Sequence, residues 1–126
     1  MKPKPSSPAL FAPARPYKGF EPVMGVWVLR NTVNGRVLLG ASPHTKGAIN
    51  KHLFTLRLGR HPNAELQRDW HEHGEAAFTA EVLHVLERRE GRGEADDRRD
   101  LAELERLCLE DLQPYGEAGY HPRPVR

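Results

Sequence analysis

One glutamate interrupts the apolar face of the last helix that the sequence predicts. From residue 100 to 112 the apolar side chains recur with a helical period. At about 100° per residue they form one stripe, made of Leu101, Leu104, Cys108, Leu109 and Leu112. Glu105 falls inside this stripe, and a buried glutamate is rare unless it is paired or binds a cation. Glu105 is therefore a candidate metal ligand. The alternatives are a narrower stripe with Glu105 at its solvated margin, or a Glu105 paired to an arginine.

Histidine is the other residue type in this chain that could bind a metal ion. The chain has seven histidines, and His71 and His73 flank Glu72. Residues two apart on a helix point in different directions, however, and the single cysteine, Cys108, cannot complete a two-cysteine site. We therefore expect no structural zinc at this sequence.

Charge is distributed unevenly along the chain. Residues 1–63 hold ten Lys/Arg and one acid, whereas residues 64–126 hold nine Lys/Arg and sixteen acids. This asymmetry favours a basic surface that contacts a nucleic-acid backbone, although the two halves could instead neutralise each other in the fold. The expected nucleic-acid-binding residues lie in and after the first hairpin: Arg36, Lys46, Lys51, Arg57 and Arg60.

The stretch 25–40, GVWVLRNTVNGRVLLG, predicts the hairpin on which the domain is built. Its apolar residues alternate on both sides of Asn34-Gly35, and these two residues favour a two-residue type I′ turn. A helix follows, capped by Ser42 or Thr45, with Ile49, Leu53 and Leu56 on its apolar face and an end near Gly59.

A second helix and a third strand complete the predicted domain. Asn63 is the expected cap of the helix, which carries Leu66 and Trp70 on one face and stops at Gly74. Alternation over 77–86 predicts a third strand that pairs with the hairpin. The charge run 87–99 is expected to be a mobile loop before the last helix.

Length and composition predict the number of domains and the cellular location of the protein. We expect a proline-rich basic tail over 1–22, one domain over 23–121 and a short tail over 122–126. No apolar run is long enough to cross a membrane, and we expect no signal peptide. The lone cysteine suits a cytoplasmic protein. The oligomeric state is left open.

The triplet Gly25-Val26-Trp27 precedes the triplet Leu38-Leu39-Gly40, with ten residues between Trp27 and Leu38. The chain also reads RNTVNG at 30–35, LGRHPN at 58–63 and LQRDW at 66–70. In these triplets and segments the sequence from Gly25 to Tyr120, about three-quarters of the chain, resembles the GIY-YIG nuclease superfamily, particularly homing endonucleases and stand-alone bacterial domains. The resemblance implies an α+β fold, a three-stranded antiparallel sheet flanked by helices, and single-metal phosphodiester hydrolysis in active members.

Most of the catalytic positions implied by the resemblance carry other residues. Trp27 and Leu38 stand where active members have tyrosines that position or deprotonate water, and Ala48 stands where they have an arginine. His121 replaces an asparagine, whereas Glu105 keeps the metal-binding glutamate. Neither an indole nor an alkyl group takes a proton from water, so the original chemistry is expected to be impaired or lost.

Substitutes for the lost groups are conceivable. Lys51 lies one turn from Ala48, and His52, His61 or His121 could act as a base or share a cation with Glu105. The sequence thus favours a nuclease-fold protein that binds DNA or RNA or acts as a regulatory module and requires no cofactor. The alternative is a divergent Mg²⁺- or Mn²⁺-dependent endonuclease. A scaffold that contacts only protein is a third possibility.

Overall fold

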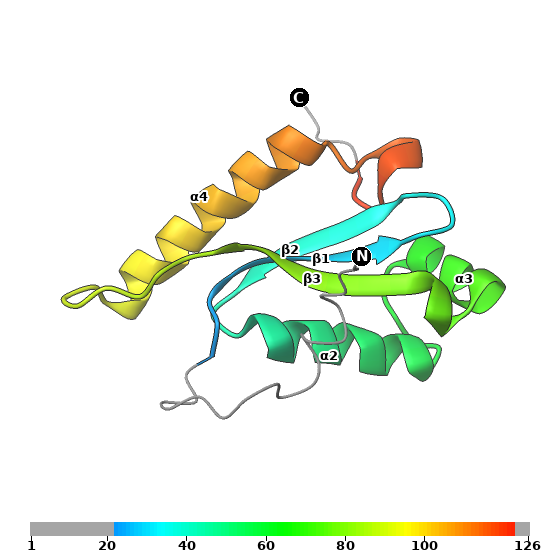
Figure 1. Ribbon diagram of the computed structural model, residues 1–126, viewed down its shortest axis with the longest axis horizontal. Coiled ribbons are helices and arrows are strands. Elements are labelled where there is room, and N and C mark those ends of the chain that lie inside the picture. Colours follow the sequence, from blue (N-terminus) through cyan, green and yellow to red (C-terminus); the bar gives the residue numbers. More distant parts are fainter. Residues whose placement is uncertain (1–21, 123–126) are drawn as a thin grey trace, which may run out of the picture.

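The protein, described by a computed structural model over residues 22–122, places one antiparallel sheet between helices (Figure 1). The strands are β1 (Gly25–Asn31), β2 (Val37–Ser42) and β3 (Phe78–Val85). The helices are α2 (Thr45–Arg57), α3 (Ala64–His73) and α4 (Glu94–Leu112), with short 3₁₀ turns at Glu75–Ala77 and Gly116–Ala118. The expected α+β class with three strands is confirmed. The expected tails, residues 1–22 and 122–126, lie almost entirely outside the described residues.

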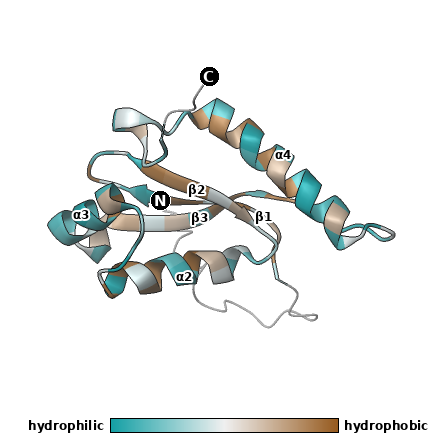
Figure 2. Cartoon of the chain, turned by 180° about the vertical axis from the view of Figure 1, so that it is seen from behind, coloured by the Kyte–Doolittle hydropathy of each residue, from teal (hydrophilic) through white to brown (hydrophobic). Residues whose placement is uncertain are grey.

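The central strand of the sheet is β1, because the strand order is β2-β1-β3 and both pairings are antiparallel. A strand with neighbours on both sides and helices on both faces must be apolar throughout, which explains the unbroken run at 26–29. Trp27 and Leu29 point toward α2 and α3, whereas Val26 and Val28 point toward α4. Figure 2 shows the resulting hydrophobic sheet between helices with mixed surfaces.

The hairpin forms, but its turn differs from the one expected. Asn31 N–H bonds to the Arg36 carbonyl at 2.8 Å, so four residues, 32–35, form the loop. Gly35 has a φ of +79°, whereas Asn34 does not have the positive φ that a type I′ turn requires. The type I′ prediction is wrong because the loop has four residues instead of two, and Gly35 N–H bonds to the Asn31 carbonyl at 2.7 Å. Within this loop the Asn34 side chain accepts from Arg36 N–H and donates to Asp69.

The ends of the first two helices follow the expectations in part. Asn63 caps α3, with its side chain accepting from Leu66 N–H at 3.0 Å, and α3 ends at Gly74 as predicted. At α2 the cap position is His44, which makes no side-chain cap bond. Thr45 instead donates to the Val23 carbonyl, so the predicted Ser42 or Thr45 cap is wrong. The hydroxyl of Thr45 thereby ties α2 to the chain entering β1.

The charge run after β3 is only partly a loop, because α4 begins at Glu94. Three acids occupy its first turn, where the helix dipole favours negative charge, and Asp96 accepts from Gly93 N–H at 3.2 Å. Arg92 pairs with Asp100 across the start of the helix. The mobile-loop prediction is wrong for residues 94–99, since local electrostatics can order a segment with little apolar surface. No helix within residues 22–122 has the length and apolarity to cross a membrane.

Candidate functional site

Two of the positions singled out for catalysis lie inside the protein core. Trp27 is 4% exposed and Leu38 is 9% exposed, and both pack in the cluster between the sheet and α2. Ala48 packs against the same cluster from α2. The indole lies directly over Gly40, where an added Cβ would meet Cζ2 of Trp27 at 2.6 Å. The glycine of the second triplet is therefore needed here to accommodate the ring of the first.

His52 and His61 form a hydrogen-bonded pair beside Trp27. His52 Nδ1 and His61 Nε2 are 2.8 Å apart, and the rings of Trp27 and His52 have centroids 4.8 Å apart. Asn63 N–H donates to His61 Nδ1 at 3.0 Å, so the proton of His61 lies on Nε2 and is donated to His52. His52 consequently carries its own proton on Nε2. The structure thus brings together three of the predicted residues, Trp27, His52 and His61.

Burial keeps both imidazoles of this pair neutral. Burial lowers the pKa of His52 to about 4, helped by the nearby His61 and Lys51, and burial also lowers the pKa of His61. A base with so low a pKa is weak, because proton abstraction is most effective when the pKa lies near the working pH. The pair is therefore arranged as a fixed neutral hydrogen-bond relay rather than as a poised general base.

His121 is used by the C-terminal segment to hold the edge of the sheet. Its Nε2 accepts from Leu39 N–H at 2.9 Å, and Tyr120 N–H donates to the Val37 carbonyl at 3.0 Å. Burial lowers the pKa of His121. The nitrogen that would take a proton from water is thus already engaged with the backbone of β2.

Glu105 lies on α4, which covers the sheet face opposite to α2 (Figure 1). It is half-buried beside Leu104 and Leu109, and burial raises the pKa of its carboxyl group. Within residues 22–122 no hydrogen bond or ion pair reaches this carboxylate. Of the sequence-based alternatives, pairing to an arginine is therefore wrong within this range.

The five expected nucleic-acid-binding residues divide into two groups. Arg36 is largely buried and pairs with Glu65 at 2.6 Å, while Arg57 pairs with Glu75 at 2.6 Å. Lys46, Lys51 and Arg60 are exposed and form no ion pair within residues 22–122. The free positive charge of this region therefore comes from the three residues that remain solvated.

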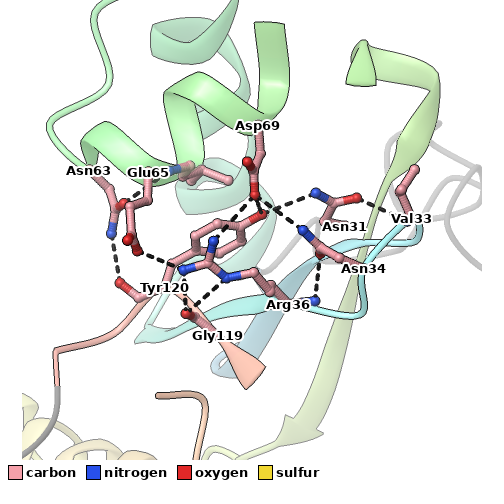
Figure 3. Close-up of polar contacts among 10 residues, drawn as sticks. Asn31, Val33, Asn34, Arg36, Asn63, Glu65, Asp69, Gly119 and Tyr120 are labelled. Carbon is pink, nitrogen blue, oxygen red and sulfur yellow. Dashed lines mark hydrogen bonds and ion pairs between the residues drawn. The ribbon is translucent and has the colours of Figure 1, made fainter. Parts of the chain in front are cut away.

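A buried polar network, which sequence reasoning missed, joins the hairpin, α3 and the C-terminal segment (Figure 3). Tyr120 donates its hydroxyl to Asp69 at 2.7 Å and accepts from Asn31 at 3.1 Å. Arg36 lies 4.4 Å over the Tyr120 ring and donates to the Gly119 carbonyl. Figure 3 shows these side chains pointing toward one another from three separate segments. The sequence did contain a signal for this network, because the segments 30–35 and 66–70, which carry the family resemblance, include Asn31 and Asp69.

Asp69 also belongs to a group with metal-ligand chemistry. Within residues 22–122, Asp69, Glu72 and His73 place one potential ligand atom each within 4.8 Å of one another. Oδ2 of Asp69 already accepts from Tyr120 and Asn34, and the Arg36 guanidinium lies 3.5 Å from it. A cation here would be repelled by Arg36. Glu105 is not part of this group, because it lies on α4 and offers a single carboxylate.

Comparison with solved structures identifies the architecture. The catalytic domain of the homing endonuclease I-TevI matches with a TM-score of 0.62 and 24% identity, over 77% of this chain and 95% of that domain. A mutant of the catalytic domain of the intron endonuclease I-TevI matches with a TM-score of 0.63 and 21% identity, over 79% and 92%. This chain has the fold of the I-TevI catalytic domain. The GIY-YIG-like fold implied by the resemblance is confirmed. No family model and no curated protein matches the sequence.

Proposed function

We propose that this protein is a nuclease-fold module that binds the backbone of nucleic acid but has lost efficient phosphodiester hydrolysis. The observation that supports the loss most strongly is the burial of Trp27 and Leu38 in the core between the sheet and α2. These positions carry water-activating tyrosines in the active members that the sequence resembles. Here they carry an indole and an alkyl chain whose contribution is packing.

The remaining chemistry supports the same conclusion. Ala48 presents a methyl group where charge stabilisation of the phosphate is required, and removal of one such donor costs roughly 3 kcal/mol in the transition state. His52 and His61 satisfy each other, and His121 is engaged by Leu39. A gain of activity would therefore require several of these contacts to be broken at once.

Binding is supported by the charge of α2. The helix sequence TKGAINKHLFTLR contains no acidic residue, and Lys46 and Lys51 are exposed along it, followed by Arg60 in the next loop. Exposed cations of this kind attract phosphates without reading the base sequence. Their contribution to affinity falls as the salt concentration rises, because the release of counterions from the nucleic acid then gains less entropy. We therefore propose largely sequence-independent, salt-sensitive binding to DNA or RNA.

A divergent metal-dependent endonuclease is the second candidate, and Glu105 is the observation that favours it. A half-buried carboxylate without a partner within residues 22–122 is costly unless it serves a ligand. If Glu105 binds a metal, Mg²⁺ or Mn²⁺ raises the melting temperature of the natural protein but not of Glu105→Gln, because a ligand that binds only the folded state stabilises it. We expect no such shift.

The main test measures binding and cleavage separately. Purified protein is incubated with plasmid, single-stranded DNA and RNA in Mg²⁺ or Mn²⁺. We expect salt-sensitive binding without cleavage, and a loss of binding when Lys46→Glu and Lys51→Glu are combined. The matched control is Arg98→Glu with Arg99→Glu on α4, which changes the net charge equally. Equal losses for both pairs, or metal-dependent nicking by the natural protein, would contradict the proposal.

A repair experiment asks whether only the reacting groups have gone. The combined changes Trp27→Tyr, Leu38→Tyr, Ala48→Arg and His121→Asn restore the residues implied by the resemblance. Detectable Mg²⁺-dependent nicking that Glu105→Ala then removes would locate the loss in these four positions. A folded but inactive variant would show that the surrounding positions have changed as well, since catalytic geometry tolerates little displacement.

A further inference from the structure

The outer face of α2 exposes an aromatic ring among positive charges. Phe54 is 60% exposed and Leu58, one turn later, is 54% exposed. On a helix the neighbours of a residue lie three and four positions away. For Phe54 these are Asn50 and Lys51 on one side and Arg57 and Leu58 on the other. A flat apolar ring therefore lies between two cationic side chains, both of them exposed.

A hollow of about 300 Å³ lies between α2 and β3. Its apolar lining includes Leu29, Leu53 and Phe78, and its polar lining includes Asn50, Arg57 and Glu75. Asn50 and Arg57 are also the residues one turn before and after Phe54. By helix geometry the ring therefore lies beside a concavity that combines apolar walls with an amide, a guanidinium and a carboxylate.

We propose that Phe54, with Asn50, Lys51, Arg57 and the adjoining hollow, is a binding site for single-stranded nucleic acid. One unpaired base stacks on the phenyl ring and enters the hollow, and the flanking phosphates are held by Lys51 and Arg57. The inference rests on the proposed nucleic-acid binding and adds the strand state of the ligand.

The ring is the reason for preferring single strands over duplexes. In a duplex both faces of every base are covered by neighbouring bases. In a single strand, by contrast, a base can expose one face, on which an aromatic side chain can stack. Lysines alone would bind either form. An exposed phenylalanine adds affinity only where a base can be reached, so Phe54 should discriminate between the two.

The charge of the site favours a nucleic acid over a protein partner. A stable protein interface buries roughly 800 Å² per partner around an apolar centre, whereas two exposed apolar side chains, Phe54 and Leu58, stand here among cations. Glu75, which lines the hollow, is already paired with Arg57. An exposed ion pair of this kind contributes little, so a phosphate can replace the carboxylate.

The test compares a labelled oligothymidylate of about 15 nucleotides with a duplex of the same length, by fluorescence anisotropy at low salt. We expect Phe54→Leu to weaken single-strand binding about tenfold and to leave duplex binding within about twofold, since one stacked base is worth that much. Leu107→Ala, at an exposed apolar residue of α4, is the matched control and should change neither affinity. Because Phe54 is exposed, its replacement should not unfold the protein.

A second variant gives a direct signal of stacking. Phe54→Trp should keep the affinity for single strands, and its fluorescence should be quenched by the oligonucleotide, whereas Trp27 and Trp70 are buried and should not respond. Salt-sensitive binding that is indifferent to Phe54 and to strand state would overturn this inference and leave the proposed function standing. Absence of salt-sensitive binding to either form would overturn both.

Discussion

Replacing Tyr120 with phenylalanine removes one oxygen at the point where the hairpin, α3 and the C-terminal segment meet. The hydroxyl donates to Asp69 Oδ2 at 2.7 Å and accepts from Asn31 Nδ2 at 3.1 Å. All three side chains are buried, with exposed fractions of 3% for Tyr120, 5% for Asp69 and 0% for Asn31. Both partners of the lost hydroxyl therefore remain in a place that water reaches poorly.

The expected loss follows from the nature of the two bonds. A hydrogen bond to an ionised group contributes roughly 1.5–3 kcal/mol and one between neutral groups roughly 0.5–1.5 kcal/mol. We therefore expect Tyr120→Phe to lower the free energy of unfolding by about 2–4 kcal/mol. For a domain of this size, whose total stability is about 5–15 kcal/mol, the melting temperature should fall by at least about 10 °C.

The assay is urea denaturation at neutral pH, followed by the fluorescence of the buried residues Trp27 and Trp70. Tyr115→Phe is the matched control, since the Tyr115 hydroxyl makes no hydrogen bond within residues 22–122. A loss below about 0.5 kcal/mol for Tyr120→Phe, or equal losses for both variants, would refute the assignment of stability to this network.

The same hydroxyl gives a signature at alkaline pH. Burial, together with the neighbouring Asp69, raises the pKa of Tyr120 from 10.0 to about 12. A group whose pKa is raised by folding adds stability that is complete below its unfolded value and is lost as the pH passes through its folded value. The natural protein should therefore lose stability between pH 10 and about 12. Tyr120→Phe should lack that step, and an identical alkaline limb would contradict this reading.

Three further predictions concern other sites. Gly40→Ala should cost roughly 1–3 kcal/mol because its Cβ meets Trp27, whereas Gly47→Ala on α2, whose added Cβ would make only an ordinary contact with His44 at 3.7 Å, should not destabilise; urea denaturation compares them. The lowered pKa of His52 predicts that stability is lost from pH 6.5 toward about 4, and His52→Gln should reduce that acid sensitivity. The raised pKa of Glu105 makes its charge unfavourable above pH 4.5, so Glu105→Gln should raise stability at pH 7 but not at pH 4.

Local sequence determined the elements themselves. Alternation and apolar runs placed β1, β2 and β3, and the cap at Asn63 and the stop at Gly74 gave the ends of α3. These signals act within a few residues, through backbone geometry and nearest-neighbour hydrogen bonds, so they can be read without knowledge of the fold. The resemblance added the order of the elements, which local signals alone do not specify.

The tertiary structure decided where the polar side chains are used. From the sequence, Arg36 was expected to be an exposed cation. In the fold it contacts Glu65, Asp69 and the carbonyl of Gly119. From the sequence, Asn34 was expected to occupy a type I′ turn. In the fold its side-chain amide donates a hydrogen bond to Asp69, 35 residues away. In both cases the partner is distant in the sequence: the buried Asp69 accepts from the Asn34 amide and lies beside the Arg36 guanidinium, and a buried carboxylate left without such partners would be costly. Sequence near Asn34 and Arg36 does not contain that partner, so only the folded chain could assign their roles.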